Sequence, residues 1–116
     1  MSLRILVVED EAMVALLMED LLTDLGHEVT AMAARLPEAL AMAGEAQIDF
    51  AILDVNLAGS ASFPVSDVLA ARGVPHVFAT GYGSAGIGPP YSERIILHKP
   101  VRIAELNRAI QAASTA

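Results

Sequence analysis

Residues 50–53 read FAIL and are followed at once by Asp54, so a short apolar run ends abruptly in an acid. A run of this length and composition predicts a buried β-strand. The stretch LRILVV at residues 3–8 repeats the pattern and ends in Glu9-Asp10. The sequence therefore predicts two buried strands, each with carboxylates at its carboxyl end.

Strands and helices alternate outward from these two runs. Further strands are expected over residues 28–33, 74–79 and 95–98, and helices over 11–25, from 37 to 44–46, over 64–72 and over 103–113. The small residues of 57–62 predict a loop. Such alternation indicates βαβ units with a parallel sheet and right-handed crossovers. We expect an α/β fold with one domain over residues 1–116 and no output domain.

The composition restricts the partners of the protein. The 116 residues carry a net charge of −7, which disfavours direct binding to nucleic acid or to an anionic membrane surface. Cysteine is absent, so the chain has neither a disulfide framework nor thiol chemistry. No apolar stretch approaches the ~20 residues of a membrane span, and no signal peptide is recognisable. We expect a cytoplasmic protein.

The informative side chains stand just after the expected strands. Parallel strands bring their carboxyl ends to one edge of the sheet, where ligands of such folds bind. That edge gathers Glu9, Asp10, Asp54, Thr80 and Lys99. Each of them has an ordinary explanation when taken singly, as a helix start, a turn or a surface residue. Their convergence at one edge indicates a functional site.

The chemistry of this set favours a hard metal ion and a phosphoryl group. Three carboxylates in one crevice repel each other and favour a bound cation. Oxygen ligands with room for water suit Mg²⁺, whereas His27, His76 and His98 lack the spacing of a zinc site. One carboxylate can then attack a phosphoryl group whose oxygens Lys99 and Thr80 hold, because positioning and charge neutralisation dominate phosphoryl transfer.

Over essentially its whole length the chain resembles the receiver domains of two-component response regulators. The likeness runs through ILVVEDE (5–11), AILDVNL (51–57), FATGYG (78–83) and HKP (98–100). The resemblance implies a flavodoxin-like, five-stranded parallel sheet of order 2-1-3-4-5 with helices on both faces. FATGYG is similar to a subgroup, known mainly from alphaproteobacterial single-domain receivers, that lacks a proper fourth helix. Because residues 81–94 hold four glycines and two prolines, we expect that helix to be short or absent.

The resemblance also implies a role for each acid. Asp54 is the phospho-acceptor, and a histidine kinase or histidine phosphotransfer protein is the donor. Asp10 is a direct Mg²⁺ ligand, Glu9 is the neighbouring acid that commonly acts through water, and Asp54 and the backbone carbonyl of Asn56 complete the metal ligands.

The remaining site residues handle the phosphoryl group. The resemblance implies that Thr80 and Lys99 bind its oxygens, and that the small Gly81 leaves access to it. Such a protein is a signalling switch that catalyses only its own phosphorylation and dephosphorylation.

One position departs from the family pattern. The aromatic residue expected three positions before the lysine is Ile96, so no ring can swing inward there. We expect instead that the segment 81–94, held by few packed contacts at rest, changes conformation around Thr80 and offers Tyr82 or Tyr91 to a downstream target. The oligomeric state stays open, including a dimer formed on phosphorylation.

The helix expected over residues 11–25 has two faces of interest. Its inward face is predicted to consist of Val14, Leu17, Met18, Leu21 and Leu25. Leu16 falls opposite, beside Asp20 and Thr23. The family's phosphodonor helices pack beside this helix, so we predict that Leu16 lies on the kinase-docking surface.

Two alternative functions stay open. A degenerate receiver would act as an interaction module that is never phosphorylated. A phosphatase of the haloacid dehalogenase type would also use Asp54, but it needs a second acid two residues later, where this chain has Asn56. A flavin-binding protein of the same topology is disfavoured because Glu9, Asp10 and Glu11 would repel a phosphate.

Overall fold

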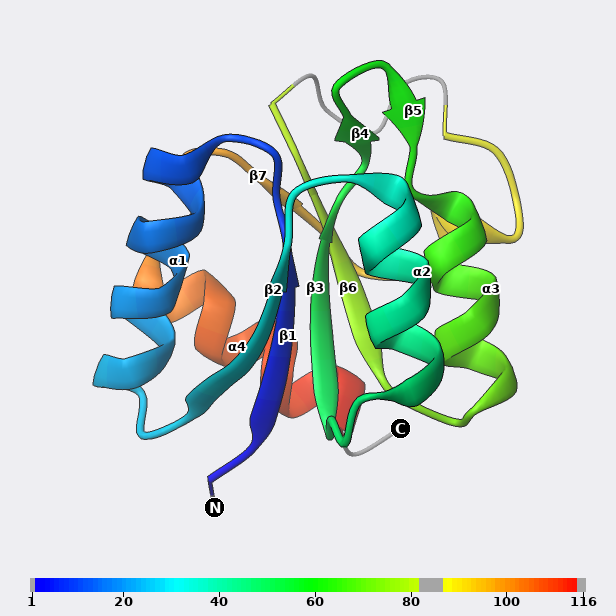
Figure 1. Ribbon diagram of the computed structural model, residues 1–116. Helices are drawn as coiled ribbons and strands as arrows, with labels where there is room; N and C mark the ends of the chain where they lie inside the picture. The colour runs from blue at the N-terminus through cyan, green and yellow to red at the C-terminus, as the bar shows by residue number, and fades with distance from the viewer. Residues whose placement is uncertain (1, 82–86, 115–116) are drawn as a thin grey trace.

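Five strands form one parallel sheet in the computed structural model, which describes residues 2–81 and 87–114 (Figure 1). They are β1 (Arg4–Val8), β2 (Glu28–Ala33), β3 (Phe50–Asp54), β6 (His76–Thr80) and β7 (Ile96–His98). The strands lie in the order β2-β1-β3-β6-β7, which is the expected 2-1-3-4-5 when only the strands of this sheet are counted. The predicted flavodoxin-like topology is confirmed.

Helices cover both faces of the sheet. α1 (Ala12–Asp24) and α4 (Ile103–Ser114) lie on one face, and α2 (Leu36–Glu45) and α3 (Phe63–Ala71) lie on the other (Figure 1). Among the described residues, no helix is long and apolar enough to cross a membrane.

Burial on both faces explains why the central strands are apolar without interruption. Successive side chains of a strand point to opposite faces. In β1, Ile5 and Val7 therefore pack with α1 and α4, while Leu6 and Val8 pack with α2 and α3. The unbroken ILVV run thus supplies two cores at once, as parallel sheets require.

The buried face of α1 differs from the expectation at Ala15, Leu17 and Leu22. Ala15, Met18 and Leu22 are the buried residues, so the core-facing stripe is rotated from the predicted one. Leu17, expected inward, is 52% exposed, and Leu16 is exposed as predicted. The helix is apolar over most of its circumference, and for that reason periodicity alone did not fix which leucines face the core.

Residues 57–62, expected to form a loop, contain part of a hairpin. β4 (Asn56–Leu57) pairs antiparallel with β5 (Ser60–Ala61) across a two-residue turn. Both turn residues have positive φ, 51° at Ala58 and 93° at Gly59, as a type I′ turn requires. This hairpin stands above the carboxyl end of β3 (Figure 1).

The described part of the segment between β6 and β7 has little helix, which agrees with the prediction. It contains only η1, a 3₁₀ turn over Tyr91–Glu93, and residues 82–86, with Tyr82, lie outside the described residues. The expectation of few packed contacts is wrong for Tyr91. Its ring stacks on Phe63 with centroids 4.3 Å apart, and its hydroxyl donates to Asp67 at 2.9 Å. The end of this segment is therefore fixed to α3.

One buried polar pair links α3 to β6. Ser66 Oγ lies 2.6 Å from His76 Nε2, and His76 Nδ1 lies 3.0 Å from the carbonyl oxygen of Val74. In the neutral ring, with Nδ1 donating to that carbonyl, Nε2 accepts from the Ser66 hydroxyl. Burial, and secondarily the charge of Arg94, hold the pKa of His76 below its usual range, although the Val74 carbonyl opposes them.

Candidate functional site

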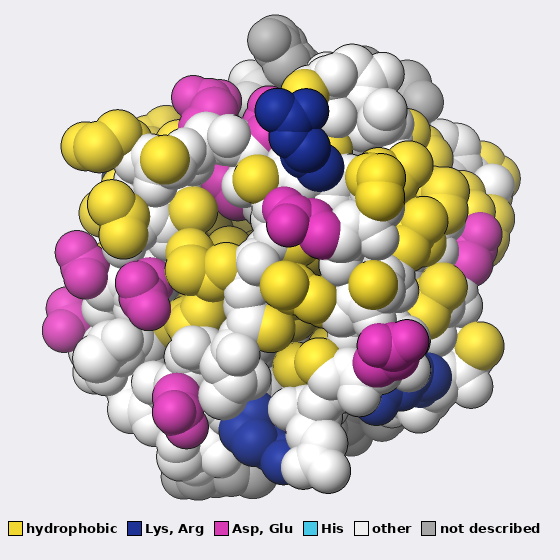
Figure 2. Space-filling view, in the orientation of Figure 1, with side chains coloured by type: hydrophobic (Ala, Val, Ile, Leu, Met, Phe, Trp, Pro, Cys, Tyr) yellow, Lys and Arg dark blue, Asp and Glu magenta, His cyan; other side chains and the backbone are white. Residues whose placement is uncertain are grey.

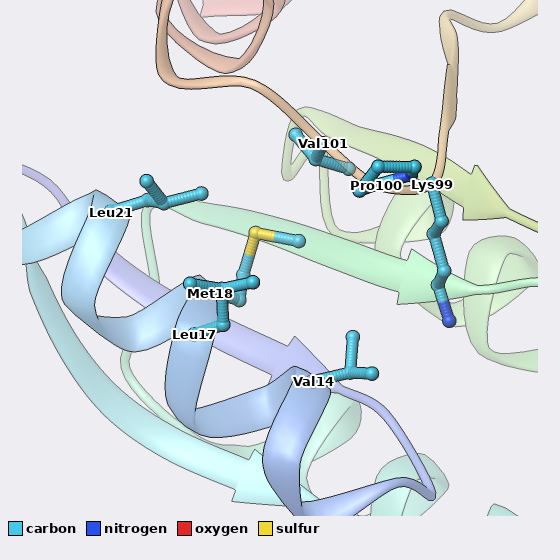
Figure 3. A pocket seen from close by; sticks show the side chains of 7 residues that line it. All are labelled: Val14, Leu17, Met18, Leu21, Lys99, Pro100 and Val101. Atoms are coloured by element: carbon cyan, nitrogen blue, oxygen red, sulfur yellow. The ribbon is translucent and has the colours of Figure 1, made fainter.

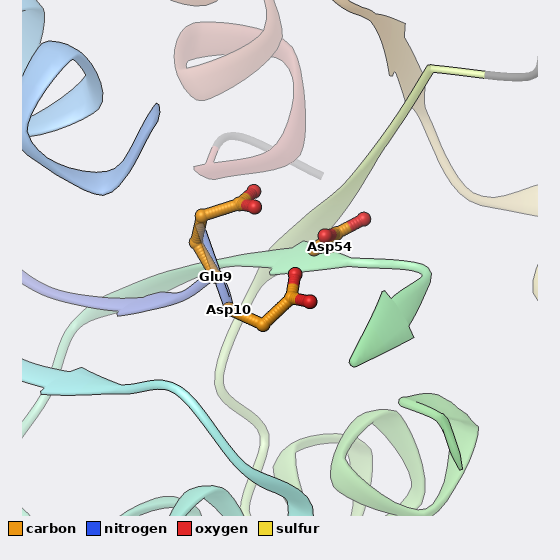
Figure 4. Close-up of side chains that lie close together, drawn as sticks. All are labelled: Glu9, Asp10 and Asp54. Carbon is orange, nitrogen blue, oxygen red and sulfur yellow. The ribbon is translucent and has the colours of Figure 1, made fainter. Parts of the chain in front are cut away.

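Glu9, Asp10 and Asp54 converge at the carboxyl edge of the sheet (Figure 4). Glu9 and Asp10 follow β1, and Asp54 is the last residue of the adjacent strand β3. Each carboxylate offers one oxygen such that the three oxygens lie within 4.8 Å of one another. Glu9 and Asp54 are buried, and Asp10 is half-buried. The sequence prediction that these acids form one cluster is confirmed in geometry.

Lys99 brings a cation to the two buried acids. Its Nζ lies 2.7 Å from Glu9 Oε2 and 3.3 Å from Asp54 Oδ2. The Lys99 backbone amide donates to the carbonyl oxygen of Thr80 at 2.9 Å, which fixes where the side chain begins. Burial lowers the pKa of Lys99, but the hydrogen bond to Glu9 and the charges of Asp54 and Glu9 outweigh it and raise the pKa above its usual value. The ammonium group is therefore charged at rest.

Asp54 has an environment unlike that of a surface carboxylate. Burial, and next the charge of Glu9, raise the pKa of Asp54 to about 7, against the opposing effects of Lys99 and of the Asn56 backbone amide. Because one lysine is shared between two buried acids, the site has an excess of negative charge. A further cation near Asp54 would relieve that excess.

The β4–β5 hairpin contributes backbone donors to the acids. The Asn56 amide donates to Asp54 Oδ1 at 3.4 Å, and the Ala58 amide donates to Asp10 Oδ2 at 3.2 Å. The Asn56 side chain is occupied elsewhere, because its Oδ1 accepts from the Gly59 amide at 2.8 Å. Sequence reasoning missed these donors, because Ala-Gly is not among the preferred pairs of a two-residue type I′ turn and only Gly59 pointed to one.

Thr80 and Gly81 lie beside Asp54 along the sheet. In the pairing of β3 with β6, Asp54 stands opposite Ala79, so Thr80 is the next residue toward the open edge. Thr80 is 5% exposed, and Gly81 is exposed. A Cβ built on Gly81 would meet no heavy atom within 4 Å, so a small residue is compatible with an open approach here.

The donor set fits a hard divalent cation. Three carboxylate oxygens this close together match the oxygen ligands and partial protein coordination that Mg²⁺ takes in proteins, with water in the remaining positions. Glu9, Asp10 and Asp54 could hold such an ion.

Comparison with known proteins identifies the family. The sequence model of the family described as the response regulator receiver domain matches residues 5–111. The chain belongs to this family. The family predicted from the four sequence stretches is therefore confirmed, and receiver domains are modules of two-component signalling that partner histidine kinases.

The similar proteins include receivers of the subgroup suggested by FATGYG. The phyllosphere-induced regulator PhyR of Methylorubrum extorquens is 32% identical over 97% of this chain, and the chain spans only 44% of the length of that relative. The solution structure of SdrG from Sphingomonas melonis Fr1 is 38% identical, with a TM-score of 0.86, and the match covers 97% of this chain and 96% of that one. The BeF₃-activated conformation of SdrG, described from Pseudomonas melonis Fr1, is 38% identical with a TM-score of 0.82, over 96% of this chain and 95% of that one.

A separate apolar cavity of about 280 Å³ lies between α1 and the segment that follows β7 (Figure 3). Its walls are Val14, Leu17, Met18, Leu21, Lys99, Pro100 and Val101. Leu17 belongs to this wall because α1 turns it away from the core and toward the cavity. The same lysine that contacts Glu9 and Asp54 also lines the cavity.

Proposed function

We propose that the protein is a phospho-acceptor switch in which Asp54 accepts a phosphoryl group with the help of Mg²⁺. The observation that carries the proposal is the position of the Asp54 carboxylate, which belongs to a carboxylate cluster suited to a cation and also contacts the ammonium of Lys99. A receiver of 38% identity has been described in a BeF₃-activated conformation, which supports the same chemistry here.

In the proposed transfer, one oxygen of Asp54 forms a bond to phosphorus. The bond between phosphorus and the imidazole nitrogen of the donor histidine breaks, and its electron pair stays on the imidazole. Glu9, Asp10, Asp54 and the Asn56 carbonyl would hold Mg²⁺, which would neutralise charge on the phosphoryl oxygens. Lys99 and the Thr80 hydroxyl hold the remaining oxygens.

The chain's residues prepare Asp54 for this role. The hydrogen bond from Asn56 orients the carboxylate, and Gly81 leaves the approach open. A pKa of about 7 means that a nearby cation would favour the charged, nucleophilic form. The proposed activity is restricted to the protein's own phosphorylation and dephosphorylation, since Asn56 cannot protonate a leaving group as the second acid of a haloacid dehalogenase-type phosphatase does.

The proposed donor is a histidine kinase or a histidine phosphotransfer protein, and its proposed docking surface includes Leu16 on α1. Met13, Leu16 and Leu17 are 79%, 53% and 52% exposed, so apolar side chains lie open on this helix. Figure 2 shows apolar and acidic side chains together on the side of the molecule where α1 lies. Phosphorylation would change the conformation around Thr80 and the segment 81–94 for a downstream target.

Acetyl phosphate labelling tests the proposal. With Mg²⁺ present, the mass of the intact protein should rise by one phosphoryl group, and Asp54→Asn should remove that rise. Asp49→Asn is the matched control, because Asp49 is paired with Arg4 at the opposite end of the sheet. Labelling that persists in Asp54→Asn would refute the assignment, and unlabelled wild-type protein would favour the interaction module.

A further inference from the structure

The pairing register of the β4–β5 hairpin determines where the backbone groups of Asn56 point. Directly opposed pairs in antiparallel strands alternate between hydrogen-bonded and non-hydrogen-bonded. Leu57 and Ser60 flank the two-residue turn, and Ser62 N donates to Val55 O at 2.9 Å. The pair between them, Asn56 with Ala61, is therefore non-hydrogen-bonded, and both backbone groups of Asn56 point away from β5.

The side to which they point is the carboxylate cluster. The Asn56 amide donates to Asp54 Oδ1. The N–H and C=O of one strand residue point to the same side, so the Asn56 carbonyl faces the same cluster. A shift of the hairpin by one residue would turn this carbonyl toward β5 and away from the acids.

The turn of the hairpin reaches the third acid. Ala58 N donates to Asp10 Oδ2 at 3.2 Å, from a residue 48 positions away in sequence. Ala58 makes this contact with a φ of 51°, a conformation that alanine rarely adopts. The strain is maintained by the turn, in which Gly59 takes a φ of 93° and the Asn56 side chain accepts from its amide.

We propose that the β4–β5 hairpin is the positioning element of the metal site, with Ala58 as a positioning residue for Asp10. The inference rests on the proposed function, because it assumes that the acids hold Mg²⁺. The turn aligns Asp10 through the Ala58 amide, and the register aligns Asp54 and the Asn56 carbonyl. The hairpin thereby acts on the Mg²⁺ affinity through its backbone groups.

The experiment compares two glycine-to-alanine variants that carry the same backbone strain. Gly59 and Gly26 have φ values of 93° and 88°, and a Cβ on either would meet no heavy atom within 4 Å. Gly26 lies between α1 and β2, at the opposite end of the sheet from the acids. Gly26→Ala should lose stability and keep the wild-type Mg²⁺ affinity. In Gly59→Ala the metal-free turn can relax out of the strained conformation, so the penalty of a left-handed alanine should appear as weaker Mg²⁺ binding, by up to about tenfold.

Mg²⁺ titration followed by amide NMR measures the dissociation constants, with the Ala58 and Gly59 amides as direct reporters. Equal Mg²⁺ affinity in Gly59→Ala, Gly26→Ala and wild type would overturn the inference and leave the proposed function intact. A wild-type protein that binds no Mg²⁺ would overturn both.

Ala58→Asn tests the inference in the opposite direction and does not depend on a destabilised variant. Asn-Gly is the preferred pair for this turn type, so the variant should bind Mg²⁺ about two- to threefold more tightly. An unchanged or weaker affinity in Ala58→Asn would count against the hairpin as the positioning element.

Discussion

Asp54→Asn is expected to stabilise the metal-free fold at alkaline pH. In the folded protein the oxygens of three carboxylates lie within 4.8 Å of one another, and Lys99 contacts two of these acids. Burial and the charge of Glu9 raise the pKa of Asp54 to about 7. A charged Asp54 therefore costs folding free energy, and asparagine of nearly the same shape removes that cost.

The sign and size of this stability difference follow from the pKa of Asp54. The folded carboxyl group binds its proton more tightly than the unfolded chain does, so its contribution reduces stability as the pH rises from 3.8 to about 7. At about 1.4 kcal/mol per pH unit, the upper limit is about 4 kcal/mol. The pKa of about 7 already includes the favourable ion pair with Lys99, so only relaxation of the buried site reduces this limit. The variant should therefore gain about 2–4 kcal/mol near pH 8 and little near pH 4.

Urea unfolding with a chelator at both pH values measures the difference, and Asp20→Asn, an exposed change on α1, is the control. Mg²⁺ should narrow the gap because it stabilises the native wild type in proportion to binding, whereas the variant lacks one ligand. If wild type and Asp54→Asn were equally stable near pH 8, the electrostatic account of the site would be wrong.

Three further predictions concern docking, the buried histidine and Tyr91. Leu16→Glu should leave stability and acetyl phosphate labelling unchanged but slow phosphoryl transfer from a cognate kinase. Leu17→Glu should slow the transfer similarly if the cavity wall is part of the docking surface. Transfer rates equal to that of wild type would refute the docking surface. Ser66→Ala should destabilise the fold by about 1–3 kcal/mol because it leaves His76 Nε2 without its donor. Folding lowers the pKa of His76, so its contribution to stability is complete above the unfolded pKa of 6.5 and is lost as the pH falls below that value. This pH dependence is opposite in sign to that of Asp54. In urea unfolding, the double variant Ser66→Ala/His76→Phe should therefore lose less stability than wild type between pH 7.5 and about 5. Tyr91→Ala should speed amide hydrogen exchange over residues 87–94. Tyr91→Phe should speed it less because the stack on Phe63 remains. Equal protection in wild type and both variants, with or without fluoroberyllate, would show that Tyr91 does not hold the segment.

The sequence predicted the fold and the clustered acids because both depend on simple regularities. Unbroken apolar runs such as ILVV mark strands covered on two faces, and the acids stand at strand ends, where parallel topology brings them together. The roles of Asp54, Thr80, Lys99 and Asn56, the single domain over 1–116 and the cytoplasmic location remain predictions.

The features that the sequence did not predict depend on which side chains pack against one another in the fold. Leu16 and Leu17 are chemically equivalent on an apolar helix, and only packing against the sheet decides that both lie outside the core. The hairpin depends on two consecutive residues with positive φ, one of them alanine, which has no preference for that conformation. Tyr91 was expected to be available to a partner, and its contacts with Phe63 and Asp67 arise from residues about 25 positions away.

Lys99 is shared between two environments that differ in chemistry. Its side chain lines the cavity beside α1 (Figure 3). Its ammonium nitrogen lies 2.7 Å from Glu9 Oε2. A ligand that fills the cavity would restrict the torsions of this side chain, and through them the distance from the ammonium to Asp54. A small apolar compound bound there would therefore change the charge balance around Asp54 without contacting a carboxylate.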